Sequence, residues 1–191
     1  GTSFNDKVVK SHINAFLSLQ KSGTILIARD GRPHGVDYLN ICYKTITNAG
    51  FNVIDCGIIP TPTAQFLVQE NKYSGGIIIT ASHNPTEWNG LKFLDDGGCF
   101  VNSEKTQLLL DNADKNISPA QSNPGDILTD EEMWKNHVQH TLKLSCIDVK
   151  NIKSKKYKIV VDAVNSAGSE IIPYLLHYFL QAYYYLPLIS S

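Results

Sequence analysis

The residues best suited to chemistry lie in the segment 80–85 (TASHNP), at the end of the apolar run 76–80 (GIIIT). In open α/β sheets, the loops at the carboxyl ends of strands are where ligands bind. Because Pro85 keeps Asn84 out of the helical region, the chain cannot continue directly into a helix. We therefore expect a polar loop that presents the Ser82 hydroxyl, the His83 imidazole and a carboxamide. On composition alone, an ordinary turn rich in Ser and Asn fits equally well.

Cationic side chains are expected near this loop. The tight-turn dipeptide at 89–90 (NG) returns the chain so that Lys92 can lie beside the loop. Arg29 and Arg32 belong to the loop RDGR, which follows another apolar strand. Converging serine, histidine, lysine and arginine side chains suit a phosphate better than an acyl group. A hydrolase is disfavoured because there is no GxSxG elbow, and adjacent Ser82 and His83 rarely adopt base geometry.

The elements that would position these residues alternate between strand and helix. Apolar runs predict short buried strands at 24–28, 52–56 and 76–80. Helical periodicity predicts helices at 5–19 and 36–49, the second ending at Gly50, and another helix from the turn 57–62 to residue 70. This alternation predicts an α/β fold with a largely parallel sheet between helices.

Antiparallel and helical elements are expected to follow. A hairpin is predicted from 91–94 and 99–101, then a helix from Ser103 to about residue 115 and a linker at 116–125. Thr129 and Glu132 form a capping-box pattern for another helix. A strand at 158–162, a small-residue loop at 163–168 and a helix through Leu180 predict a second unit. We expect one domain over 1–145 and the beginning of another over 146–191.

Composition excludes several classes of protein. The 191-residue chain has a formal net charge of −1, so no basic footprint indicates nucleic-acid binding. The cysteines lack metal or disulfide spacing and predict free thiols in a reducing, cytoplasmic environment. A membrane span at 171–189 is disfavoured because Pro173 and Pro187 interrupt it.

His137 and His140 could share a helix face, but without a third ligand nearby an ordinary surface helix is favoured over a metal site.

Four segments together resemble the α-D-phosphohexomutase superfamily of phosphoglucomutases, phosphomannomutases and phosphoglucosamine mutases. Residues 80–93 (TASHNPTEWNGLKF) are similar to its phosphoserine loop. The flanking similarities are GIIPTP at 57–62, ARDGR at 28–32 and KIVVDAVNSAGSEIIP at 158–173. The resemblance covers nearly the whole chain except about the last ten residues. It implies a three-layer α/β/α domain with a mixed, mostly parallel sheet, plus the first βα unit of a second similar domain.

The resemblance also implies a mechanism. Ser82 would carry a phosphoryl group between C1 and C6 of a hexose or hexosamine phosphate, through a 1,6-bisphosphate intermediate. Mg²⁺ would bind the phosphoserine oxygen of Ser82. Lys92 would take part in proton transfer or orient the reacting groups, and His83 would line the pocket as a further catalytic residue. Substrate and phosphate contacts would come from the remaining polar side chains near the loop: Thr80, Asn84, Arg29 and Arg32.

The chain also departs from the family pattern. The family's GTSGIRG-type opening loop carries an arginine, whereas here Phe4 directly follows Ser3. No DGDxDR run is present to supply the aspartates that bind the metal, and the third and fourth domains are missing. We therefore expect part of a phosphohexomutase that is inactive alone. The alternative is a non-catalytic sugar-phosphate-binding or assembly module, and a homodimer stays open in either case.

Overall fold

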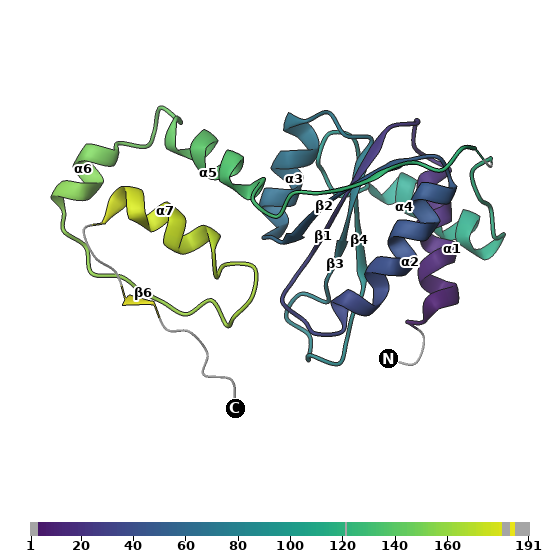
Figure 1. Ribbon diagram of the computed structural model, residues 1–191, viewed down its shortest axis with the longest axis horizontal. Coiled ribbons are helices and arrows are strands. Elements are labelled where there is room, and N and C mark those ends of the chain that lie inside the picture. The colour runs from purple at the N-terminus through teal and green to yellow at the C-terminus, as the bar shows by residue number, and fades with distance from the viewer. Residues whose placement is uncertain (1–3, 121, 181–183, 186–191) are drawn as a thin grey trace.

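The computed structural model, which describes residues 4–120, 122–180 and 184–185, contains a five-stranded sheet (Figure 1). The strand order is β4-β3-β1-β2-β5. β1 pairs in parallel with β2 and β3, β5 pairs in parallel with β2, and β4 runs antiparallel to β3 at the edge. The expected mixed, mostly parallel sheet is thus confirmed. The strand bounds are β1 Thr24–Arg29, β2 Asn52–Ile58, β3 Gly75–Ile79, β4 Leu91–Leu94 and β5 Ile127–Thr129.

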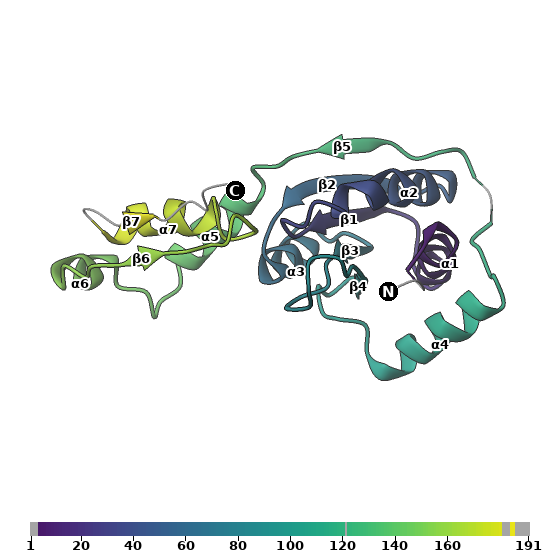
Figure 2. The ribbon, with the colours of Figure 1, turned by 90° about the horizontal axis from the view of Figure 1, so that it is seen from below.

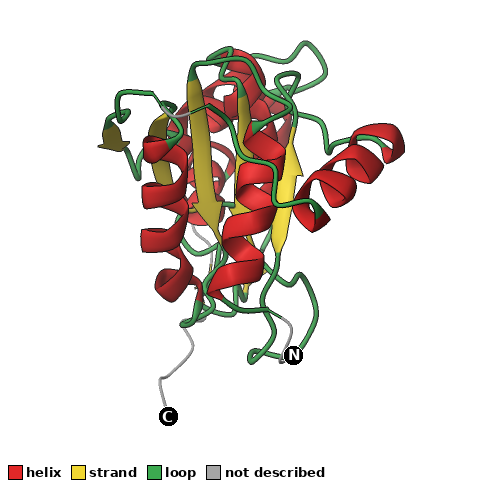
Figure 3. Ribbon diagram, turned by 90° about the vertical axis from the view of Figure 1, so that its right-hand side faces the viewer, coloured by secondary structure: helices red, strands yellow, loops and turns green. Residues whose placement is uncertain are grey.

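Helices cover both faces of the sheet because successive strand residues point in opposite directions. Ile25 and Ile27 of β1 face α1 (Asp6–Leu17), α2 (Gly35–Asn48) and α4 (Ser103–Asp114). Leu26 and Ala28 face α3 (Thr61–Glu70) and α5 (Trp134–Leu142). Figure 2 shows α1 and α2 on one side of the strands and α3 on the other, and Figure 3 shows the strands between helices. The three-layer arrangement follows from this alternation.

The capping-box prediction is wrong. Thr129 is the last residue of β5, where it pairs with Asp55 of β2. Helix α5 begins later, at Trp134, with no side-chain cap. Asp130 forms the turn instead, because its Oδ1 accepts from the Glu132 backbone N–H at 3.0 Å. β5 could not be predicted from the sequence, because a strand of three exposed residues gives no clear alternation of buried and exposed positions.

The predicted hairpin forms in a short version, and its first strand also joins the sheet. Two backbone hydrogen bonds link the predicted strands, from the Asp95 N–H to the Cys99 carbonyl at 2.8 Å and from the Val101 N–H to the Phe93 carbonyl at 3.2 Å. β4 also pairs antiparallel with β3, after the turn at 89–90. The turn closes tightly, since the Thr80 N–H donates to the Gly90 carbonyl at 2.9 Å. β4 therefore fixes the end of the TASHNP loop, because it pairs with the strand that precedes the loop.

The C-terminal part contains α6 (Val149–Ser154), β6 (Val160–Val161), α7 (Ile171–Phe179) and β7 (Tyr184–Tyr185), with β6 and β7 paired in parallel. α6 was not expected, and β6 is shorter than the predicted strand 158–162. Helix α7 packs against α5, where the rings of Trp134 and Tyr174 meet edge to face at 5.1 Å. Within residues 4–120, 122–180 and 184–185, no helix has the length and hydrophobicity that a membrane span needs. The division into domains at residue 146 stays a prediction.

A loop of the C-terminal part rests on the RDGR loop after β1. The Gly31 N–H donates to Ser166 Oγ at 2.9 Å. A Cβ added at Gly31 would lie 2.9 Å from the Asn165 carbonyl oxygen and 2.9 Å from the Ser166 Cα. Such distances are too short for real Cβ contacts, so only glycine permits this approach.

Gly31→Ala should therefore push loop 163–168 away from the RDGR loop. We expect the free energy of unfolding to fall by about 1–3 kcal/mol, the usual cost of overpacking, in urea denaturation followed by circular dichroism. Gly168→Ala is the matched control, because its added Cβ would meet only ordinary contacts at 3.4 and 3.5 Å. Equal stability of the two variants would contradict the contact.

The four cysteines should divide into two reactive and two protected thiols. Burial raises the pKa of both Cys42 and Cys56 to about 12, whereas Cys99 and Cys146 are exposed. Only the thiolate reacts, so at pH 8 roughly one buried thiol in ten thousand would be ionised. We expect Ellman's reagent to modify two thiols rapidly in the native chain and all four after unfolding in urea. Rapid modification of all four thiols in the native chain would show that the regions around Cys42 and Cys56 are open to the reagent.

Candidate active site

Ser82 lies where the sheet places ligand-binding loops. It follows β3, which is a direct neighbour of the central strand β1, and its side chain is exposed to solvent. The parallel register pairs Arg29 with Ile79, so the loops after β1 and β3 leave the same edge of the sheet. Segments about fifty residues apart in sequence thereby meet beside the loop that carries Ser82.

The backbone of Ser82 is held in an unusual conformation. Its φ is +56°, in the left-handed region that costs a non-glycine residue roughly 1–2 kcal/mol. Its N–H donates to Thr80 Oγ1 at 3.0 Å, and Thr80 is buried with 7% of its surface exposed. Non-glycine residues in this region cluster at active sites, where surrounding contacts maintain them.

His83 lies beside the serine but is poorly placed to act as its base. The distance from Ser82 Oγ to His83 Nδ1 is 3.5 Å, longer than the 2.6–3.2 Å at which a general base works. Both side chains are exposed. The geometry therefore agrees with the sequence argument against a serine hydrolase.

Arg32 makes the largest set of contacts around the loop. Its guanidinium donates to the backbone carbonyls of four loop residues, Ser82, Asn84, Pro85 and Trp88. It also donates to Asp30 Oδ2 from Nε at 2.9 Å. Asp30 Oδ2 further accepts from Thr80 Oγ1 at 2.6 Å, and Oδ1 accepts from the Arg32 backbone N–H. These contacts join the loops after β1 and β3.

Asp30 is the residue that sequence reasoning missed. It lies between two arginines directly after a strand, and its bond to the N–H two residues on is a common Asp turn. That local pattern was visible in RDGR, whereas its contact with Thr80, fifty residues away, depends on the sheet register. Its carboxylate therefore belongs with the site residues.

No hydrogen bond links the other expected side chains to Ser82, and the register places Arg29 and Lys92 on opposite faces of the sheet, Arg29 beside Ile79 and Lys92 beside Ile78. Arg29 Nη1 donates to the Asp30 carbonyl at 3.3 Å. Lys92 pairs with Ile78 across the β3–β4 ladder, and its ammonium lies 5.6 Å from the centre of the Phe100 ring. Asn84 is exposed, and its backbone N–H donates to the Ala81 carbonyl at 3.1 Å within the loop.

The described residues do not form a metal centre. Within 4–120 and 122–180, no three histidine, cysteine, aspartate or glutamate side chains gather in a way that could hold a metal ion. His137 and His140 instead pack against Phe66, with ring centroids 4.8 and 5.0 Å away. His137 also lies 3.0 Å from Thr63 Oγ1, and burial followed by the charge of His140 lowers its pKa. This pair therefore joins α5 to α3.

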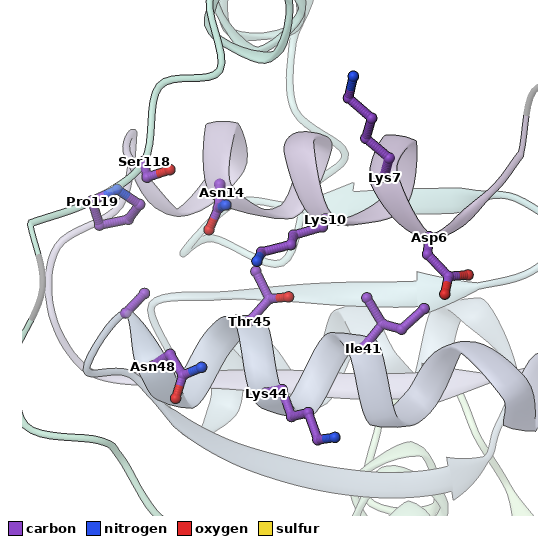
Figure 4. Close-up of a pocket in the computed structure, with 11 residues that line it drawn as sticks. Asp6, Lys7, Lys10, Asn14, Ile41, Lys44, Thr45, Asn48, Ser118 and Pro119 are labelled. Atoms are coloured by element: carbon purple, nitrogen blue, oxygen red, sulfur yellow. The ribbon is translucent and has the colours of Figure 1, made fainter.

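Two hollows lie on the surface of this part of the chain. A hollow of about 270 Å³ adjoins the Ser82 loop and is lined by Phe4, His34, Asp37, Tyr38, Glu87 and Asn89. A larger one of about 650 Å³ lies between α1 and α2 and is lined partly by lysines. Figure 4 shows Lys10 directed toward Thr45, whereas Lys7 and Lys44 point outward. None of the site residues lines the larger hollow. Its lysine side chains do not point toward one position where an anion could bind (Figure 4).

Known proteins are similar to this chain in both sequence and fold. Residues 1–120 match the family described as Phosphoglucomutase/phosphomannomutase, alpha/beta/alpha domain I. The chain is 33% identical over 156 residues to a phosphoglucosamine/phosphogalactosamine mutase of Sulfurisphaera tokodaii, covering 80% of the chain and 34% of that protein. It is 33% identical over 153 residues to a phosphoglucomutase/phosphomannomutase of Thermococcus kodakarensis, covering 80% of the chain and 33% of that protein.

A solved structure extends the likeness to the fold of nearly the whole chain. A phosphoglucomutase/phosphomannomutase family protein of Burkholderia thailandensis superposes with a TM-score of 0.70 at 21% identity, covering 98% of this chain and 41% of that one. The chain spans about a third of the length of the curated relatives it matches. With a family match over residues 1–120 and a loop built around an exposed serine, this chain belongs to the phosphoglucomutase/phosphomannomutase family.

Proposed function

We propose that the protein containing this chain is a phosphohexomutase and that Ser82 is its phosphoryl carrier. One observation carries the proposal: an exposed serine hydroxyl at the carboxyl end of a sheet strand, in a backbone conformation that neighbouring side chains maintain. The names of its relatives as mutases of hexose and hexosamine phosphates support the same class of reaction.

The proposed reaction consists of two phosphoryl transfers in opposite directions. In the first, the bond between phosphorus and Ser82 Oγ breaks and a new bond forms to a hydroxyl oxygen of the sugar monophosphate. The hydroxyl loses its proton as Ser82 Oγ regains one, and the product is a 1,6-bisphosphate. After the bisphosphate turns over in the site, its other phosphoryl group returns to Ser82. Atoms and charge balance, since the phosphoryl group changes position without any net oxidation.

Phosphoryl transfer depends chiefly on positioning and on charge stabilisation, which cationic side chains can supply. We assign proton transfer, or orientation of the reacting oxygen, to Lys92. We assign substrate or phosphate contacts to His83, Asn84 and Arg29. A phosphoserine carries about −1.5 to −2 charges, so cationic residues on the strands and loops beside it would stabilise it.

Magnesium does not fit the described residues as a complete site. Phosphoserine oxygen at Ser82 is a ligand that this hard cation accepts. No group of three suitable side chains accompanies it among residues 4–120 and 122–180. Other parts of the whole protein would have to supply the remaining ligands, and no step above is routed through the ion.

Ser82→Ala should abolish both phosphorylation and turnover in the full-length protein. The test incubates the protein with glucose 1,6-bisphosphate and Mg²⁺, maps phosphorylation by mass spectrometry, and measures conversion between hexose 1- and 6-phosphates. We expect phosphate at Ser82 in the wild type. We expect neither phosphate nor measurable turnover in the variant, because the nucleophilic oxygen is missing.

Ser22→Ala is the matched control, since Ser22 is an exposed serine that precedes β1 at the opposite edge of the sheet. It should behave as the wild type. Full turnover by Ser82→Ala would refute the role of the serine. An unphosphorylated wild type without mutase activity would instead favour a non-catalytic sugar-phosphate-binding module.

A further inference from the structure

We propose that Arg32 is a positioning residue that clamps the loop carrying Ser82, and that it does not bind the substrate phosphate. This inference rests on the proposed function, because the clamp matters only if Ser82 accepts a phosphoryl group. It also changes the role that sequence reasoning gave to Arg32, which was a phosphate contact.

The first argument is that Arg32 has no N–H group to spare. A guanidinium carries five N–H donors in a fixed planar fork. Nε donates to Asp30, Nη1 to the carbonyls of Pro85 and Trp88, and Nη2 to those of Ser82 and Asn84. Five acceptors therefore match five donors, and a phosphate oxygen would have to displace one of them.

The second argument is burial. Only 11% of the Arg32 side chain and 19% of the Asp30 side chain are exposed. Charge-assisted hydrogen bonds in such a partly dry setting are stronger than neutral ones, and removing one partner leaves an unpaired charge. The guanidinium is therefore held in place and is poorly placed to follow a substrate that turns over in the site.

The third argument is that the contacts converge on the strained serine. The Ser82 carbonyl accepts from Arg32, and the Ser82 N–H donates to Thr80 Oγ1. Thr80 in turn donates to Asp30, which binds Arg32. Both backbone polar groups of Ser82 are thus fixed by side chains of one connected network. This network holds φ of Ser82 at +56° and so fixes the backbone from which the hydroxyl projects.

Lysine cannot replace this arginine. Its ammonium is a compact charge with three donors and no planar fork, so it cannot reach carbonyls on several sides at once. A residue that merely supplied positive charge near a phosphate would tolerate lysine. The two roles therefore predict different results for the same conservative substitution.

The test compares Arg32→Lys with Arg32→Met in the full-length protein. We expect both to slow single-turnover phosphorylation of Ser82 from glucose 1,6-bisphosphate by about 100-fold, the scale of a misplaced reacting group. The KM for the sugar phosphate should change less than twofold while kcat falls. Hydrogen exchange should rise at residues 81–88 and stay unchanged in β1 and β2, which separates loop release from unfolding.

A second pair of variants keeps the test informative if the arginine variants fail to fold. Thr80→Val removes only the hydroxyl that links Asp30 to the Ser82 N–H, whereas Thr80→Ser retains it. We expect Thr80→Val to lose phosphorylation rate and Thr80→Ser to recover most of it.

The outcomes separate the clamp from the proposed function. A wild type in which Ser82 is never phosphorylated would overturn the proposed function itself. A phosphorylated wild type with an equally fast Arg32→Lys would overturn the clamp alone. A raised KM with unchanged kcat and an unchanged loop would also overturn it, since that pattern indicates direct phosphate binding.

Discussion

The carboxylate of Asp30 accepts hydrogen bonds from three donors at once, and the site is organised around that convergence. Two of the donors belong to Arg32 and one to Thr80. The interaction is possible only because β1 and β3 are parallel neighbours whose ends are level, with Arg29 beside Ile79. The sheet register therefore shapes the site directly, because it brings the Asp30 carboxylate after β1 next to the Thr80 hydroxyl after β3.

The same junction also touches the C-terminal part of the chain. Gly31 lies between Asp30 and Arg32 and donates to Ser166 from the loop after β6. A glycine in that position allows close backbone approach without displacing the two charged side chains on either side. The loop that carries Ser82 and the loop after β6 thus both contact the short segment 30–32.

Much of the fold could be predicted from sequence because it depends on local patterns. Buried strands such as 76–80 and the glycine that ends α2, with φ of +81° at Gly50, follow from apolar runs and backbone preferences. The strand β5 and helix α6 could not be predicted, since three exposed residues and a six-residue helix carry too little periodicity. Ser82 stood out as a loop residue after a strand. The part played by Asp30 could not be derived, because it depends on a contact made across the sheet.

The central claim is that Arg32 holds the loop and leaves the phosphate to other groups. A crystal structure of the full-length protein phosphorylated at Ser82 would test it most directly. The account predicts that the guanidinium still donates to Asp30 and to the carbonyls of Ser82, Asn84 and Pro85, with the φ of Ser82 still positive. A guanidinium that has left these carbonyls and binds the phosphoserine oxygens would contradict it.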